Sequence, residues 1–387
     1  MFKQIFSITL MNILSIPSRW STSSVIIVGI GGVVAVLVAI FSMAVGLNKV
    51  FENSVDENRT IMVRSGANDE MSSNLDIDDA NLIASRTFFE TVAPELYCVA
   101  NVPKKATGYP ANIVVRGVTD DSFDLRPELR ILEGNRFTPG KNELIVGRKA
   151  QQEFDGLEIG DRVTIREVTW TVVGYFEADG SAIESELWAG LTSVQSAFRF
   201  EGGISIVRAR VQHGMDIKSI RTSLDDDPRL SLAIQTEADW YERQASTGTL
   251  VIRIFGWVIT IIMSIGAIFA ALNTMYSAIA SRKYEIATLR AIGFGGFPVV
   301  VSVMVEALLL AVLGGLLGAS IAYVAFNGFT VSTLNTSSFS QIAFDFAVTP
   351  ELIGSGLVVS LVLGLIGGLF PAIRSATLPV TNALRGE

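Results

Sequence analysis

Four long apolar stretches constrain the fold of this 387-residue chain more than any other feature. Each has about 20 residues or more, the length that an α-helix needs to cross about 30 Å of hydrocarbon. The sequence therefore predicts an α-helical membrane protein with four transmembrane helices. We expect these helices at residues 21–47, 250–280, 298–326 and 351–371.

The long hydrophilic part of the chain, residues 48–249, lies between the first and second spans. It holds 22 of the 30 Lys and Arg residues and 33 of the 38 Asp and Glu residues, so the net negative charge of the chain is concentrated there. An acidic surface repels nucleic acid, and we therefore expect no nucleic-acid partner.

Segments of this hydrophilic block alternate between strand and helix signals. β-Branched and aromatic residues predict strands at 112–118, 143–147 and 204–211, and further short strands within 161–176. Asp76 and Asp216 stand where they would cap helices. The pattern predicts a large α+β extracytoplasmic domain made from both ends of the block, with a β-rich insertion near 120–200.

Basic residues outside the block predict the orientation of the chain. They precede span one, lie between spans two and three, and follow span four, whereas the polar loop 327–350 has none. By the positive-inside rule, both termini and the 281–297 loop are cytoplasmic and the large domain lies outside the cytoplasm, in a multi-pass membrane protein. The basic residues concerned are Lys3, Arg19, Arg282, Lys283, Arg290, Arg374 and Arg385.

The two ends of the chain are short. Residues 1–20 have one apolar helical face and predict an amphipathic helix in the membrane interface, which Pro17 would end. A cleaved signal peptide is the alternative, but the apolar run Val25–Leu47 has 23 residues and lacks a convincing cleavage site. We expect residues 372–387 to form a short cytoplasmic tail.

Residues typical of catalytic or metal sites are scarce. One cysteine, Cys98, and one histidine, His213, exclude a disulfide framework and a His-rich metal site. The sequence contains no phosphate-binding G-x-x-x-x-G-K-[ST], no G-x-S-x-G and no H-E-x-x-H motif. We expect no catalytic residue, no metal and no cofactor, and we expect that the chain does not bind ATP by itself.

The loop SRKYEIATLRAIGFGG, residues 281–296, predicts a short charged helix between two spans. We interpret it as the place where a separate, energy-supplying protein acts on the chain, with an ordinary positive-inside loop helix as the alternative. Gly293 would end the helix by adopting a positive φ. The docking face would consist of Tyr284, Ile286, Leu289 and Ile292, with Glu285 and Arg290 at its edges.

Inside the spans, one ionisable residue and several glycines are candidates for a polar pair and for close helix packing. Glu306 lies roughly 12 Å into the third span, and we expect it to pair with a polar group or to extend toward the cytoplasmic side, with a proton relay as the alternative. Small residues let helices approach closely, either within one chain or between two copies. The glycines at such positions are Gly314, Gly318, Gly364 and Gly368.

Three parts of the sequence resemble one protein family. EIATLRAIG at 285–293, with Arg282 before it, resembles the R-x-x-E-I-x-x-L-R-A-x-G signature of FtsX/MacB-type ABC transporter permeases. The region from Pro371 to Arg385 is similar to the family's C-terminal P-A-x-x-A-x-x-x-P-x-x-A-L-R motif. Segments 132–137, 143–147, 157–161 and 171–175 look like the MacB-type periplasmic core.

The resemblance implies a permease subunit that works with a separate cytoplasmic ABC ATPase subunit, which would bind the ATP. It also implies a second permease copy in a homodimer, a possible periplasmic membrane-fusion adaptor and outer-membrane channel, and export or extraction of a substrate by mechanotransmission. The resemblance further implies a bacterial inner-membrane protein whose large domain is periplasmic. The alternative function for this chain is that of an FtsX-like regulator of a periplasmic cell-wall hydrolase or of a lipoprotein-releasing permease. By resemblance, the ATPase-coupling residues are Arg282, Glu285, Ile286, Leu289, Arg290 and Gly293.

Overall fold

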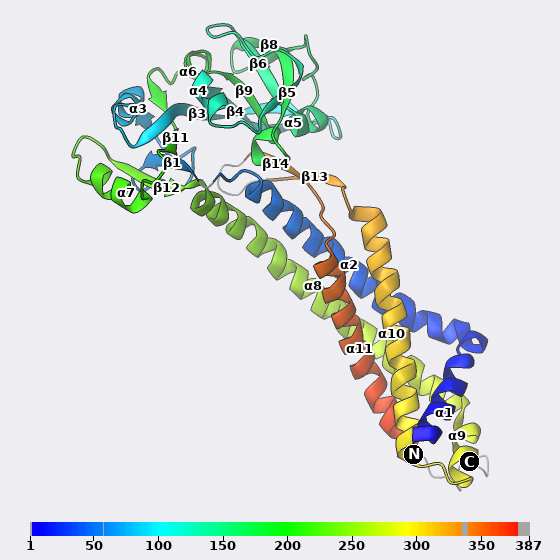
Figure 1. Cartoon of the computed structure of the whole chain (residues 1–387). Helices are drawn as coiled ribbons and strands as arrows, with labels where there is room; N and C mark the ends of the chain where they lie inside the picture. The colour runs from blue at the N-terminus through cyan, green and yellow to red at the C-terminus, as the bar shows by residue number, and fades with distance from the viewer. Residues whose placement is uncertain (1, 57, 335–339, 378–387) are drawn as a thin grey trace. The chain divides into compact units, whose positions relative to one another are not determined.

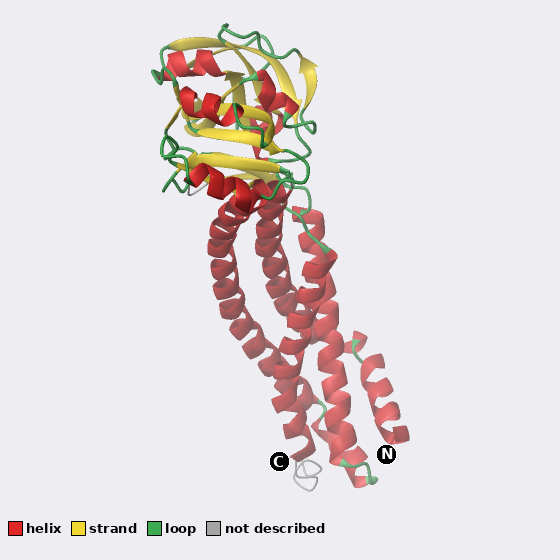
Figure 2. Ribbon diagram, turned by 60° about the vertical axis from the view of Figure 1, so that its left-hand side comes forward, coloured by secondary structure: helices red, strands yellow, loops and turns green. Residues whose placement is uncertain are grey.

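The structure, a computed structural model, describes residues 2–56, 58–334 and 340–377. The chain divides into two compact units. The membrane unit comprises Met1–Val45, Val251–Phe329 and Phe346–Glu387, and the strand-rich unit comprises Gly46–Leu250 and Thr330–Asp345. Helices and loops make up the described part of the membrane unit, whereas strands and short helices make up most of the other (Figure 2).

Four helices are long and apolar enough to cross a membrane: α2 (Trp20–Glu52), α8 (Glu237–Ser281), α10 (Gly296–Phe326) and α11 (Pro350–Thr377) (Figure 1). The protein is therefore a multi-pass membrane protein, with a large α/β domain between the first and second of these helices. Each helix extends beyond the predicted span at one end or at both, and α2, α8 and α11 continue into polar sequence. The shorter elements of the membrane unit are α1 (Phe2–Leu14), the 3₁₀ turn η1 (Pro17–Arg19) and α9 (Lys283–Ala291).

Proline residues lie at two of the helix ends that differ from the prediction. The predicted fourth span ends at residue 371, whereas α11 runs through Pro371 to Thr377. Proline destabilises the interior of a helix. Pro371 and Ala372 are buried in the membrane unit, however, and this packing stabilises the helix as far as Thr377. α10 begins at Gly296, so Pro298 is its third residue, where an N–H would still have no partner within the helix.

α10 packs closely on α2 through two of the predicted glycines. A Cβ built on Gly318 would lie 2.2 Å from the carbonyl oxygen of Gly31, and one built on Gly314 would lie 2.8 Å from that of Ile27. Both distances are shorter than van der Waals contact, so larger residues at these positions would push the helices apart.

α11 packs on α10 in the same way. A Cβ built on Gly364 would lie 2.5 Å from the Cβ of Ala311, and one built on Gly368 would lie 2.6 Å from the Cβ of Ala307. All four predicted glycines thus make close contacts inside one chain. The sequence alone left open whether they pack within the chain or between copies.

α1 packs on α10, so one side of this helix is exposed and the other is buried. Phe6, Leu10 and Leu14 are exposed, as expected for a helix in the membrane interface. Asn12, in contrast, is buried, and its side-chain amide donates to the Ser302 hydroxyl at 2.5 Å. The sequence analysis did not predict this polar contact, because Asn12 and Ser302 are 290 residues apart in the chain.

The strand-rich unit is organised around one ten-stranded sheet with the order β12-β1-β11-β3-β4-β9-β6-β8-β5, and β7 pairs with β8 outside this path. Most neighbours are antiparallel, but β4–β9 and β6–β8 are parallel. The strands are β1 (Arg59–Arg64), β3 (Phe89–Pro103), β4 (Pro110–Val118), β5 (Arg130–Gly134), β6 (Glu143–Gly147), β7 (Arg162–Ile165), β8 (Val168–Glu177), β9 (Glu186–Gly190), β11 (Ile206–Val211) and β12 (Leu232–Thr236).

β3 joins the two parts of this sheet. Its first half pairs with β11 and its second half, from Leu96 to Pro103, pairs with β4. The insertion expected near 120–200 corresponds to strands β5 to β9, which extend the same sheet. The remaining elements are α3 (Ile77–Ala84), α4 (Asp120–Asp124), α5 (Arg148–Glu153), η2 (Ala182–Ser185), α6 (Leu191–Phe198), α7 (Ile217–Asp225) and the paired short strands β2 (Leu75–Asp76) and β10 (Gly203–Ile204).

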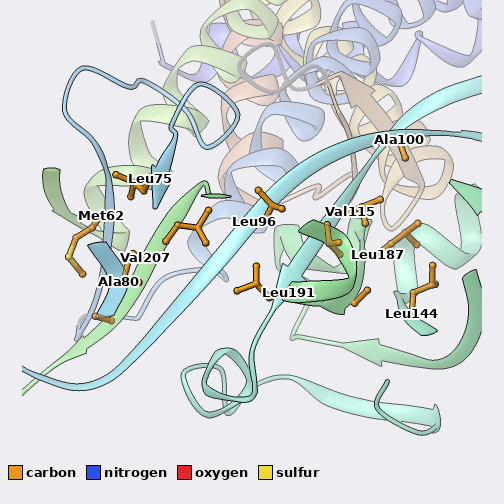
Figure 3. Packing of buried hydrophobic residues seen from close by; sticks show 14 of the residues in the cluster. Met62, Leu75, Ala80, Leu96, Ala100, Val115, Leu144, Leu187, Leu191 and Val207 are labelled. Atoms are coloured by element: carbon orange, nitrogen blue, oxygen red, sulfur yellow. The ribbon is translucent and has the colours of Figure 1, made fainter. Parts of the chain in front are cut away.

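The main core of this unit lies on the sheet. Figure 3 shows side chains from β3, β4, β6 and β9, with Leu191 of α6, gathered along the strands. Leu144, Val115 and Leu187 have no exposed surface. Burial of a Val or Leu side chain stabilises a fold by about 1.5–3 kcal/mol, so this core supports a rigid domain.

Local signals placed several of these elements correctly. Asp76 and Asp79 form a capping box at the start of α3, and the Asp216 carboxylate accepts from the backbone N–H of Lys218 at 3.2 Å at the start of α7. The loop predicted at 327–350, however, contains an antiparallel hairpin, β13 (Thr330–Leu334) and β14 (Gln341–Asp345). The alternation of apolar and polar residues in this stretch is too short to predict strands.

Candidate coupling site

The predicted loop helix is present as α9, and Gly293 ends it. Gly293 has φ +105°, which glycine adopts without strain. The N–H of Gly293 donates to the Arg290 carbonyl and the N–H of Phe294 donates to the Leu289 carbonyl, both at 3.1 Å. These two bonds make a Schellman motif, which stops the helix before the chain enters α10.

Arg282, just before α9, pairs with Glu306 of α10. Its two terminal nitrogens donate to the two carboxylate oxygens at 3.0 Å each, and both side chains are buried. A bidentate Arg–carboxylate pair is strong and has a fixed geometry. One guanidinium nitrogen also lies 3.4 Å from the Ser15 hydroxyl, between α1 and η1.

This pair changes the role predicted for Arg282. The sequence analysis placed Arg282 among residues that contact an ATPase, but its guanidinium faces the protein's own third span. Arg282 stands between the end of α8 and the start of α9. Its charge compensates the buried Glu306 carboxylate. Arg282 therefore anchors α9 instead of offering a contact surface.

Ile286 needs the same correction. Its side chain is buried and packs in the core of the membrane unit, as does its neighbour Ala287. The helix turns once every 3.6 residues, so the face that carries Arg282 and Ile286 points inward. A docking face that includes Ile286 is therefore wrong.

The outward surface of α9 consists of the other predicted residues. Tyr284 is 58% exposed and Ile292 is 72% exposed. Glu285 is also exposed, and Leu289 and Arg290 are half-buried. We call Tyr284, Glu285, Leu289, Arg290 and Ile292 the outer face of α9.

A second charged site, in the strand-rich unit, was not predicted. Four arginines and four glutamates form a buried cluster that we call the Arg–Glu cluster. The signal that could have indicated it is an arginine inside an otherwise apolar strand, as in NIVVRGV and ISIVRARV. The members are Arg59, Arg116, Arg126, Arg208, Glu70, Glu95, Glu186 and Glu237.

Arg208 connects the cluster to α8. It donates to Glu237, the first residue of α8, at 2.5 Å, and to Glu95 of β3 and Glu70 at 3.2 Å each. Arg59 of β1 also donates to Glu237, at 2.7 Å. The start of α8 is thus bound directly to two neighbouring strands of the sheet, β1 and β11.

Arg116 extends the cluster across the sheet. It donates to Glu186 of β9 through two nitrogens at 2.7 Å each, to Glu70 at 2.6 Å and to Glu95 at 3.0 Å. Burial by itself would raise the pKa of Glu95, but Arg126, Arg208 and Arg116 outweigh it and lower the pKa well below 4.5. Glu95 is therefore ionised throughout the physiological pH range.

The hairpin between α10 and α11 is also held by polar contacts within the strand-rich unit. The Lys104 ammonium donates to the Ser332 hydroxyl of β13 at 2.5 Å and pairs with Glu153 at 2.7 Å. The backbone N–H of Ala343 in β14 donates to the Ser185 hydroxyl at 3.0 Å. The strands β13 and β14 thus form part of the strand-rich unit.

Metal-ligating side chains do not gather in the described ranges. No group of three or more His, Cys, Asp or Glu residues there could hold a metal ion. Burial raises the pKa of the Cys98 thiol to about 12, which leaves it un-ionised and unreactive at neutral pH.

Comparison with known proteins agrees with this architecture. Residues 23–227 match the model of the MacB-like periplasmic core domain, and residues 257–380 match that of the FtsX-like permease C-terminal domain. An uncharacterized ABC transporter permease of Methanocaldococcus jannaschii is 25% identical over 280 residues, which cover 69% of this chain and 67% of that protein. The macrolide export ATP-binding/permease protein MacB of Escherichia coli is 23% identical over 329 residues.

The match to the Escherichia coli protein covers 80% of this chain but 48% of MacB, so the chain spans about half the length of that relative. Among solved structures, the periplasmic region of MacB from Actinobacillus actinomycetemcomitans has a TM-score of 0.39 at 14% identity and covers 49% of this chain and 93% of that one. The extracellular domain of YknZ, from Gram-positive bacteria, has a TM-score of 0.37 at 17% identity, with 46% and 99% covered. Because the two family models together match most of the sequence, this chain belongs to the MacB/FtsX type of ABC transporter permeases.

Proposed function

We propose that this permease converts ATP hydrolysis by a separate ABC ATPase subunit into motion of its strand-rich domain, which drives export or extraction of a substrate. In this proposal α9 is the coupling helix. Both termini and α9 are cytoplasmic, the strand-rich domain is periplasmic, and a second copy completes a homodimer. A membrane-fusion adaptor and an outer-membrane channel are further candidate partners.

The construction of α9 is the observation that carries this proposal. Its inner side is fixed by the Arg282–Glu306 pair and by Ile286, whereas Tyr284, Glu285 and Ile292 are exposed. A helix that is anchored in the membrane unit and exposes both charged and apolar side chains can be displaced by a bound protein without unfolding. A loop without such contacts would change its own conformation and would not move the spans.

The Arg–Glu cluster supports the proposed transmission of motion at the end of α8 that lies in the strand-rich unit. α8 is one continuous helix of 45 residues, and Glu237 at its start is held by Arg59 and Arg208. Movement of α8 along or about its axis would therefore act directly on β1 and β11. Shifting a two-state domain equilibrium takes differential binding of about 5.5 kcal/mol for a change from 1:99 to 99:1, which alternating ATPase binding at α9 would provide.

Charge reversal on the outer face of α9 tests the proposal. The variants Glu285→Arg and Arg290→Glu should lower permease-stimulated ATP hydrolysis by the co-purified ATPase at least several-fold, with normal membrane insertion. Glu242→Arg, which reverses an exposed carboxylate near the other end of α8, is the matched control and should leave stimulation unchanged. Unchanged stimulation in both α9 variants would refute coupling through this face.

Cysteine labelling tests the orientation independently. In a Cys98→Ser background, Tyr284→Cys should react with a membrane-impermeant maleimide in inverted vesicles and not in intact cells. Labelling of Tyr284→Cys from outside intact cells would overturn the assigned topology, and with it a cytoplasmic ATPase at α9. Exposed Tyr109→Cys in the strand-rich domain should give the opposite pattern.

A further inference from the structure

A cavity of about 400 Å³ lies at the ends of three helices in the membrane unit. It is lined by Tyr276, Ile279 and Ala280 of α8, Lys283 of α9 and Arg374 of α11. Two of these side chains are cations, and none of them is acidic. The cavity therefore has a positive lining beside an apolar floor.

Arg374 is held in place over the cavity. Its guanidinium carbon lies 5.4 Å from the centroid of the Tyr276 ring, a cation–π arrangement that limits the motion of a long side chain. The ring covers one face of the guanidinium, and the N–H groups at its edge stay available because Arg374 is exposed. Such N–H groups match the oxygens of a phosphate.

Lys283 supplies the second positive charge. It is half-buried as the first residue of α9 and already has an interaction within the chain. Arg374 is therefore the main anion-binding group, and Lys283 adds to the positive field. A phosphate bound to Arg374 would lie in this positive field, and it would meet no carboxylate in the cavity lining.

The surroundings of the cavity indicate a lipid as the source of that phosphate. On α11, Phe370 and Ile373 lie within one turn of Arg374 and are exposed. In a membrane-spanning helix, exposed apolar residues face acyl chains, and cationic pockets at span ends take lipid headgroups. A ligand with a phosphate and hydrocarbon chains fits both parts of this surface.

We propose that this cavity binds the phosphate of an anionic phospholipid headgroup, with Arg374 as its principal partner and the acyl chains against Phe370 and Ile373. Because Lys283 belongs to α9 and Arg374 to α11, the lipid would bridge the candidate coupling helix and the fourth span. This inference goes beyond the proposed function and rests only on the membrane embedding of the chain.

Native mass spectrometry of the full chain in detergent tests the assignment, with palmitoyl-oleoyl phosphatidylglycerol and the matching phosphatidylcholine as probes. The protein should retain phosphatidylglycerol preferentially. Arg374→Gln should weaken that binding about fivefold, because one cation beside an anionic headgroup contributes about 1 kcal/mol. The double variant Lys283→Gln/Arg374→Gln should weaken it further.

Arg253→Gln, which removes another exposed cation of α8, is the matched control and should bind phosphatidylglycerol like the parent chain. Equal retention of the two lipids, or equal losses in Arg374→Gln and Arg253→Gln, would overturn the proposal. Displacement of phosphatidylglycerol by millimolar inorganic phosphate would identify a free-phosphate site and reject the lipid.

These experiments distinguish a failure of the lipid proposal from a failure of the ATPase-coupling proposal. Thermal unfolding of Arg374→Gln in phosphatidylcholine should equal that of the parent chain, whereas added phosphatidylglycerol should stabilise only the parent. A loss of lipid binding with unchanged ATPase stimulation would leave the coupling role of α9 intact. A loss of stimulation in Glu285→Arg with normal lipid binding would leave the lipid site intact.

Discussion

The ion pair of Arg282 and Glu306 places two charges inside a helical bundle, where each depends on the other. Removing one partner of a buried pair leaves an uncompensated charge and costs about 3–5 kcal/mol, whereas replacing both by apolar residues of similar size is close to neutral. The pair thus fixes the position of α9 more than it stabilises the fold.

A double-mutant cycle checks this reasoning. Arg282→Met alone should lower the free energy of unfolding by about 3–5 kcal/mol, and Arg282→Met/Glu306→Leu should recover most of that loss. Denaturant unfolding of the detergent-solubilised chain measures both. If the double variant is as unstable as the single one, Glu306 is not the residue that Arg282 compensates.

Glu95 gives a prediction about acid stability. Its folded-state pKa lies below the ordinary value of 4.5, so its ionised form stabilises the folded state above about pH 4.5. That stabilisation is lost progressively as the pH falls below 4.5 toward the folded-state pKa. Acid should therefore weaken the Arg–Glu cluster of the strand-rich unit.

In Glu95→Gln, this part of the acid dependence should disappear, and stability at neutral pH should fall by about 3–5 kcal/mol because three arginines lose a partner. Fluorescence of the buried Trp170 and Trp188, followed from pH 7 to pH 3, reports the transition. Glu201→Gln, at an exposed carboxylate, should keep the parent profile. An unchanged acid transition in Glu95→Gln would contradict the assigned pKa direction.

Helix contacts in the membrane unit depend on glycine at the crossing points. The carbonyl oxygen of Gly31 occupies the place of a side chain on Gly318, and backbone cannot rotate away as a side chain can. The contact between α2 and α10 is therefore a property of the two elements together. A side chain at this point would separate the helices over several turns.

Gly318→Val should accordingly destabilise the bundle by about 1–3 kcal/mol or more, the usual range for overpacking. Gly354→Ala on α11 is the control, since a Cβ there would meet nothing within 4 Å. Thermal unfolding in the same detergent compares the two. Equal melting temperatures would show that α2 and α10 do not approach at Gly318.

At the scale of the whole molecule, the span of α8 stands apart from the other three. Only 22% of its apolar window is buried within the chain, compared with 44–50% for the others. Apolar side chains that a chain does not cover by itself are available to lipid or to a second copy. We predict that the second copy of the proposed homodimer contacts α8.

Cross-linking in native membranes tests this arrangement. In the Cys98→Ser background, Ile262→Cys on the exposed side of α8 should form a covalent dimer with a short bifunctional maleimide. Val324→Cys, an exposed position on α10, should stay monomeric. Cross-linking at Val324 and not at Ile262 would place the second copy on a different surface.

The sequence by itself determined the features that depend on local chemistry. Four apolar runs predicted four spans because apolar length is read along the chain, and Gly293, Asp76 and Asp216 predicted helix ends because capping involves neighbouring residues. Local periodicity also predicted the helix α9 between two spans. Whether an ATPase binds there stays a prediction.

Tertiary structure decided which charged residues meet and which way each side of α9 points. Arg282 and Glu306 are 24 residues apart, and the Arg–Glu cluster brings together residues from Arg59 to Glu237. A single sequence does not specify such pairs, because each arginine has many possible partners and only the packing of distant segments selects one. For the same reason the inward turn of Arg282 and Ile286 became visible only in the folded chain.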